Sequence, residues 1–124
     1  MTDERYWDDA KVGDECVTPA VTVTEAMVNG HGICHGGFIF SLADSAMAFA
    51  SNSYGEPALA QHCAVTFLRP GRLGETLSAE AVERARQRRS GIYDVRVSGP
   101  DGSVVAEFRG HTRTLGGGVP AKEA

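Results

Sequence analysis

Residues 36–53 read GGFIFSLADSAMAFASNS, and this stretch decides the fold. Nearly every side chain in it is apolar or small and no proline interrupts it, which predicts a helix buried on most of its sides. The next residues, Tyr54-Gly55-Glu56-Pro57, are expected to end that helix. A helix with several apolar faces needs more cover than one flat sheet gives, so either the sheet curls round it or a second subunit covers it.

The segments around this helix alternate apolar and polar residues, as strands do. Residues 17–24 are rich in Val and Thr and predict a strand, in which Pro19 favours an edge or a bulge. Residues 58–69 predict a second strand, which ends at Pro70-Gly71. We expect four side chains of the second strand to share one face: Leu59, Cys63, Val65 and Phe67.

The last third of the chain predicts further strands. Residues 92–98 and 103–115 flank a turn and are expected to form a hairpin. Residues 75–87, ETLSAEAVERARQ, have the composition of a helix, although their length and neighbours also suit a strand. A buried helix followed by three or four strands indicates an α+β fold, in which an antiparallel sheet packs on the helix.

Length and composition describe one globular domain over residues 1–124, with a short lead at 1–15 and a flexible tail at 116–124. No uncharged run reaches the roughly 18 to 20 residues that span a membrane, and the acidic start is unlike a signal peptide. Three cysteines without framework spacing suit a reducing compartment. We expect a cytoplasmic protein that does not associate with membranes.

The charges exclude one class of partner and suggest another. The net charge of −4 argues against a nucleic-acid-binding protein. Ten of the twelve basic residues are Arg, and guanidinium binds phosphate in a fork geometry, although a solvated strand end explains an arginine run more simply. His31, Cys34 and His35 are too closely spaced for a structural metal site, and adjacent Cys34 and His35 rarely point at one another. We expect no metal and no cofactor.

Asp44 is the one ionisable residue within the predicted helix. A buried carboxylate is costly unless it is paired or faces a cavity, so Asp44 is a candidate catalytic residue. An exposed helix face, or a hydrogen bond from a nearby serine, explains it equally well.

Glycines before and at the helix start favour the catalytic interpretation. Gly30, Gly32, Gly36 and Gly37 allow positive φ and close approach to another molecule. The first N–H groups of the helix, at Gly36 and Gly37, form a positive end rich in donors, which suits a carbonyl oxygen that gains negative charge. The simpler alternative is that these glycines only cap and turn.

The spacing of the two candidates has a consequence for assembly. Gly36 and Asp44 are eight residues apart, which is about 12 Å along a helix. A base and an oxyanion donor must both reach the same carbonyl, so these two residues of one chain cannot serve one substrate. If both are catalytic, two chains with antiparallel helices share each site, and the protein is at least a two-fold dimer.

Several motifs resemble one known family. MVNGHGICHGGFIFSLADSAMAFASNSYG, FLRPGRLGE, SGIYDV and VVAEFRGHTRTLGG occur in the order seen in hotdog-fold acyl-CoA thioesterases of the phenylacetic-acid degradation (PaaI) type. The resemblance covers roughly residues 21–118. It implies a long helix wrapped by a curved antiparallel sheet, with residues 75–87 as a strand, and homodimers that pair into tetramers.

The resemblance also implies roles for individual residues. The N–H of Gly36 would polarise the thioester carbonyl, and Asp44 of the partner subunit would act as general base or nucleophile. Asn29 would orient water or the carbonyl, and His35 would border the oxyanion site. Further positions are expected to bind the acyl-CoA substrate, either the thioester and acyl group (Gly37, Phe38 and Gln61) or the coenzyme (Arg69, Arg72, Arg88, Arg89, Gly91 and Tyr93).

Two alternatives remain open. The abrupt start RYWDDAKVGDE resembles MaoC-type enoyl-CoA hydratases of the same fold, although their D-x4-H pattern is absent near the helix. A sensor that binds acyl-CoA without hydrolysis is the other alternative, and a buried base would serve no purpose in it. The expected reaction is hydrolysis of an acyl-CoA, with (hydroxy)phenylacetyl-CoA or a related ester as substrate.

Overall fold

The computed structural model describes residues 18–115, and the expected lead and tail lie outside this range. Along the chain the elements are β1 (Ala20–Thr22), the short 3-10 helix η2 (Glu25–Met27), α1 (Gly36–Asn52), β2 (Ala58–Phe67), β3 (Thr76–Gln87), β4 (Ser90–Ser98) and β5 (Val104–Thr114). The strands form one antiparallel sheet in the order β1-β3-β4-β5-β2. β1 is shorter than predicted, and Val17 lies outside the described residues.

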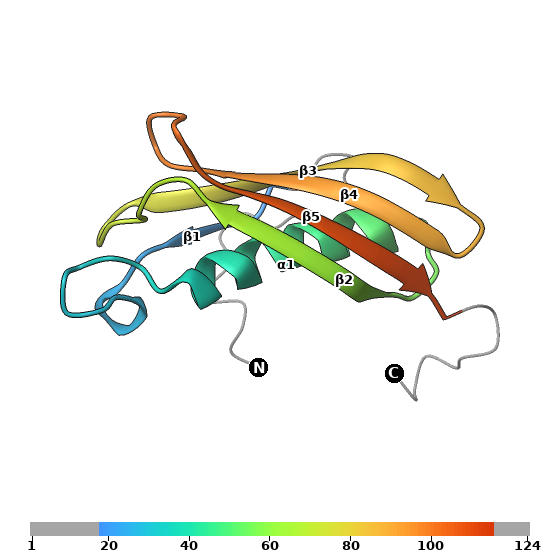
Figure 1. Cartoon of the computed structure of the whole chain (residues 1–124), viewed down its shortest axis with the longest axis horizontal. Coiled ribbons are helices and arrows are strands. Elements are labelled where there is room, and N and C mark those ends of the chain that lie inside the picture. The colour runs from blue at the N-terminus through green and yellow to red at the C-terminus, as the bar shows by residue number, and fades with distance from the viewer. Residues whose placement is uncertain (1–17, 116–124) are drawn as a thin grey trace.

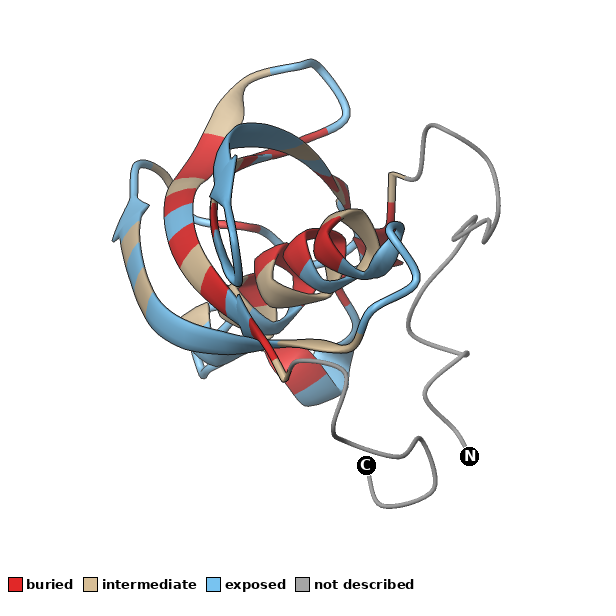
Figure 2. Ribbon diagram, turned by 90° about the vertical axis from the view of Figure 1, so that its right-hand side faces the viewer, coloured by how far each residue is buried: buried red, intermediate tan, exposed pale blue. Residues whose placement is uncertain are grey.

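The sheet lies along one side of α1 and curls round it (Figures 1 and 2). Buried and exposed residues alternate along β4 and β5, as expected for strands with one face on the core (Figure 2). The predicted α+β architecture, a helix wrapped by a curved antiparallel sheet, is confirmed. No helix in residues 18–115 has the length and apolarity that crossing a bilayer requires.

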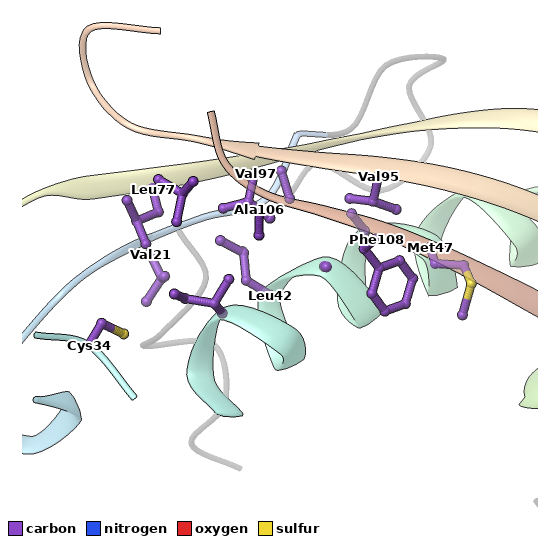
Figure 3. Close-up of a cluster of buried hydrophobic side chains, with 14 of the residues drawn as sticks. Val21, Cys34, Leu42, Met47, Leu77, Val95, Val97, Ala106 and Phe108 are labelled. Atoms are coloured by element: carbon purple, nitrogen blue, oxygen red, sulfur yellow. The ribbon is translucent and has the colours of Figure 1, made fainter. Parts of the chain in front are cut away.

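The core lies between one stripe of α1 and the concave face of the sheet. The helix contributes residues three or four apart, which share a face: Ile39, Leu42, Ala43, Ala46 and Met47. The sheet contributes Leu77, Val95, Val97, Ala106 and Phe108, which point toward α1 in Figure 3. Gly110 of β5 leaves space for Met47, because a Cβ there would overlap the Met47 sulfur. Met47 of α1 therefore packs directly against the backbone of β5.

Within the segment 75–87, Thr76–Gln87 form β3 in spite of the segment's helix-like composition. β3 pairs with β1 on one side and β4 on the other, and it buries Leu77 and Ala79 completely. Pairing and burial outweigh the modest propensity differences of Ala, Glu and Arg.

The prediction that Leu59 shares a face with Cys63, Val65 and Phe67 is wrong. In the pairing of β2 with β5, Ala60 opposes Thr112 and His62 opposes His111, so Gln61 is an extra residue in a β-bulge. The bulge reverses the alternation, and Leu59 is 57% exposed. The residue pattern alone does not reveal the extra residue.

Candidate active site

The loop before α1 is held by Asn29. Its side-chain Oδ1 accepts the N–H of His31 at 2.8 Å and that of Ile33 at 3.2 Å. Among the four glycines noted in the sequence, only Gly32 has positive φ, at +73°. The loop is tied down further by the N–H of Cys34, which donates to Gly71 O at 2.7 Å. Asn29 thus fixes the loop through its oxygen, whereas its amide nitrogen donates no hydrogen bond within residues 18–115.

The start of α1 presents open donors. His35 is the N-cap, with extended backbone (φ −62°, ψ 139°), and its side chain makes no capping hydrogen bond. Within the described residues the N–H groups of Gly36 and Gly37 have no acceptor, whereas that of Phe38 donates to His35 O at 3.0 Å. Two N–H groups at the positive end of a helix are therefore free to bind a carbonyl oxygen.

Asp44 lies beside the stripe of α1 that faces the core, and it is half-buried. Its carboxylate forms no hydrogen bond or ion pair within residues 18–115, and burial raises its pKa above the ordinary value of 3.8. Cys63 of β2 is near it, since burial and then the charge of Asp44 raise the pKa of that thiol. An unpaired carboxylate with a raised pKa is a stronger base than an exposed one.

Gly36 and Asp44 both belong to α1, as predicted, and eight residues separate them. At 1.5 Å per residue this is about 12 Å, so the donors and the carboxylate of one chain cannot contact the same carbonyl. If both groups act on one carbonyl, they must therefore come from two different chains.

The other predicted substrate-binding residues are dispersed. Gly37 and the bulge residue Gln61 are exposed, and Phe38 is half-buried against the core. Tyr93 is 1% exposed and belongs to the core, and Gly91 packs against it. The Tyr93 hydroxyl donates to Glu83 Oε1 at 2.9 Å, so it already has a partner within the chain.

The arginines do not form one cluster. Arg69 is bonded within the chain, through Nε to Ser103 Oγ at 2.9 Å and through Nη1 to Glu75 Oε1 at 3.0 Å. Arg72 is exposed, and its backbone forms an isolated β-bridge with Ile33 of the loop that precedes α1. Arg88 and Arg89 lie at the turn between β3 and β4 and are exposed. Guanidinium groups free to bind phosphate are thus found in two separate places.

Two residues that lie close to Asp44 and Gly36 were not assigned a role from the sequence. Cys63 lies near Asp44, and the ring of Phe67 packs against Gly36. Phe67 also lines a cavity of about 340 Å³ at the start of α1. The FLRP motif drew attention to this segment, but the contact with Gly36 depends on the end of β2 crossing the helix start, which no local pattern predicts.

Comparisons with known proteins agree on one family. Residues 31–106 match the model of the thioesterase superfamily. The acyl-coenzyme A thioesterase PaaI of Escherichia coli is 46% identical over 99 residues, which cover 80% of this chain and 71% of that protein. The E. coli PaaI structure has a TM-score of 0.79 over 82% of this chain and 73% of that chain. The TT0310 protein of Thermus thermophilus is 37% identical, with a TM-score of 0.81 over 90% and 95% of the two chains.

Proposed function

Because the chain belongs to the thioesterase superfamily, we propose that it hydrolyses acyl-coenzyme A thioesters to a free acid and coenzyme A. The observation that carries the proposal is that α1 contains both kinds of group that thioester hydrolysis needs. The N–H groups of Gly36 and Gly37 have no acceptor within the described residues, and Asp44, further along the helix, is half-buried and has no partner there. The name of the E. coli relative supports the acyl-CoA class of substrate. Within that class we propose (hydroxy)phenylacetyl-CoA or a related ester.

The proposed chemistry assigns one task to each group. The thioester oxygen accepts the Gly36 N–H, which stabilises the negative charge that develops on it. Asp44 takes a proton from water as the water oxygen attacks the carbonyl carbon, or its carboxylate attacks directly and water then hydrolyses the anhydride. The carbon–sulfur bond breaks, and the coenzyme A thiolate takes up a proton. We assign the amide nitrogen of Asn29, which donates no hydrogen bond within residues 18–115, to orienting the water or the carbonyl, and His35, the N-cap of α1, to bordering the oxyanion position.

Two copies of the chain are part of the proposal. An antiparallel helix from a second copy brings its Asp44 to Gly36 of the first, and the two-fold axis creates a second identical site. β2 supports this arrangement because it is an edge strand of the described sheet and its free edge can pair with another strand. We propose a homodimer that pairs further into a tetramer.

Phosphate groups of coenzyme A need cationic partners. Arg72 is exposed in the segment between β2 and β3, where its backbone forms an isolated β-bridge with Ile33 of the loop before α1, and we propose it as the first candidate to bind a phosphate. Arg88 and Arg89 remain candidates for a coenzyme that crosses to the β3–β4 turn. Arg69 is a weaker candidate because its guanidinium already has partners within the chain.

The test is thiol release from a panel of acyl-CoA esters by the wild type and by Asp44→Asn. Removal of the base is expected to lower kcat/KM by about 10² to 10⁴-fold without loss of folding. Glu80→Gln is the matched control, since it makes the same chemical change at an exposed position on the convex face of β3. Its activity should equal that of the wild type.

Equal activity of Asp44→Asn and wild type would refute the catalytic role of Asp44. A wild type that binds acyl-CoA tightly and releases no thiol would instead favour a sensor. Hydration of an enoyl-CoA without thiol release would favour the hydratase alternative.

A further inference from the structure

The ring of Phe67 covers one side of Gly36, the first residue of α1. A Cβ placed on Gly36 would lie 2.8 Å from Cζ of this ring and 3.2 and 3.3 Å from its two Cε atoms. The Phe67 side chain is also 48% exposed, although it is large and apolar. Glycine at position 36 therefore leaves room for an aromatic ring, and about half of the surface of Phe67 is not covered by other residues.

A ligand held by the Gly36 N–H must come close to this ring. The N and Cα atoms of a residue are about 1.5 Å apart, and a hydrogen bond places the acceptor about 2.9 Å from the nitrogen. Gly36 and Phe67 line the same cavity, so groups attached to a carbonyl carbon bound at Gly36 can enter a space that the Phe67 ring borders. In a thioester these groups are the acyl chain on one side and the coenzyme sulfur on the other.

The cavity beside the ring suits the acyl side. Apolar side chains line much of it: Ile33, Ile39, Phe67 and Leu68. Arg69 borders it as well, and its guanidinium donates through Nε and Nη1 to other groups of the chain, whereas its buried Nη2 lies 3.9 Å from Asp101 Oδ1 and forms no hydrogen bond within the described residues. Such walls accommodate a hydrocarbon group, whereas the amides and phosphates of the coenzyme arm would lose hydrogen bonds to water there.

We propose that this cavity is the acyl subsite and that Phe67 is a specificity-determining residue that limits the length of the acyl group. The inference rests on the proposed thioester hydrolysis. A volume of about 340 Å³ is at the lower end of the roughly 300–1,000 Å³ of ligand pockets. It accommodates a compact apolar group such as a single ring or a short chain, whereas a long fatty chain collides with the Phe67 ring.

The test compares kcat/KM for phenylacetyl-CoA, hexanoyl-CoA and palmitoyl-CoA in the wild type and in Phe67→Ala. Truncation of the ring is expected to raise the ratio of palmitoyl-CoA to phenylacetyl-CoA at least about tenfold, the usual size of a discrimination set by apolar contacts. Phe67→Leu keeps an apolar side chain at the end of β2 and should raise the ratio less. It decides the question if Phe67→Ala does not fold.

Val82→Ala is the control, because Val82 is 44% exposed and lies on the convex face of β3, away from α1. The ratio in this variant should match that of the wild type. An unchanged ratio in the folded Phe67 variants would overturn the acyl subsite while leaving thioester hydrolysis intact. Absence of thiol release by the wild type with every ester would overturn the proposed function, and this inference with it.

Discussion

At the scale of single residues, Asp44 combines two properties that ordinary surface aspartates lack. It is half-buried and it has no hydrogen-bonding or ion-pair partner within residues 18–115. Loss of hydration disfavours the charged form, so the pKa is raised. The feature that makes Asp44 a poor structural residue therefore favours the proposed role, because a carboxylate with a raised pKa is a stronger base than an exposed one.

This pKa shift predicts the pH dependence of the reaction. Catalysis requires the carboxylate form of Asp44, so kcat/KM should fall as pH is lowered through the pKa of this group. Because burial raises that pKa, the midpoint of the acidic limb should lie above 3.8. A pH–rate profile measured with a substrate that does not titrate in this range reports the midpoint for the free enzyme. A midpoint at or below 3.8 would contradict the assignment.

Cys34 and Cys63 illustrate what single residues do not reveal. Cys34 is buried against the loop that precedes α1, and burial raises the pKa of its thiol, which suits an unreactive core residue. Cys63 is likewise an isolated cysteine in the sequence, but in the structure it lies near Asp44. Only the folding of β2 along α1 distinguishes the two.

At the scale of elements, a shared carboxylate joins the end of α1 to the β3–β4 hairpin. Glu83 Oε1 of β3 accepts the hydroxyl of Tyr93 at 2.9 Å and that of Tyr54 at 2.8 Å. The guanidinium carbon of Arg86 lies 3.7 Å from the centre of the Tyr54 ring. The segment that leaves the helix is therefore anchored to the sheet.

The two tyrosines form a matched pair for a stability test. Tyr93 is 1% exposed and Tyr54 is 49% exposed. Tyr93→Phe should lower the free energy of unfolding by about 1–2 kcal/mol, because the hydroxyl of a buried residue loses its hydrogen bond to a carboxylate. Tyr54→Phe should change it by less than about 0.5 kcal/mol, since water replaces the lost partner. Denaturant unfolding measures both, and equal losses would show that burial does not govern the strength of this contact.

Elements differ in how far local sequence predicts them. The helix over residues 36–52 follows from a long run of apolar and small residues without proline. The strands around Tyr93 and Phe108 follow from the alternation of apolar and polar residues, which burial of one face imposes. Residues 76–87 required the family resemblance, since pairing with two neighbouring strands overrides their helical composition. The bulge at Gln61 depends on how β2 pairs with β5, and no pattern within β2 encodes it.

At the scale of the whole molecule, both catalytic candidates lie on one helix, and this arrangement is the basis of the proposed site shared between two chains. Helix geometry separates Gly36 from Asp44, and the sequence spacing alone predicted this separation. The partner chain that would unite them, and the acyl cavity beside Phe67, depend on contacts between segments distant in sequence. The positions of the two candidate groups along α1 were thus predictable, whereas the cavity beside Phe67 was not.

The shared site makes a quantitative prediction for mixed dimers. Gly36→Pro removes the N–H donor, and proline is compatible with the first helical position because His35 already has extended backbone. Gly36→Ala adds a similar Cβ against Phe67 but keeps the N–H, so it measures the effect of crowding alone. Gly36→Pro and Asp44→Asn should each be inactive as homodimers.

The most direct measurement is the activity of purified heterodimers that contain one Gly36→Pro chain and one Asp44→Asn chain. One of their two sites combines an intact Gly36 from one chain with an intact Asp44 from the other, so about half of the wild-type activity should return. Differently tagged chains, produced together and purified through both tags, provide the sample. Heterodimers as inactive as either parent would contradict a site shared between two chains.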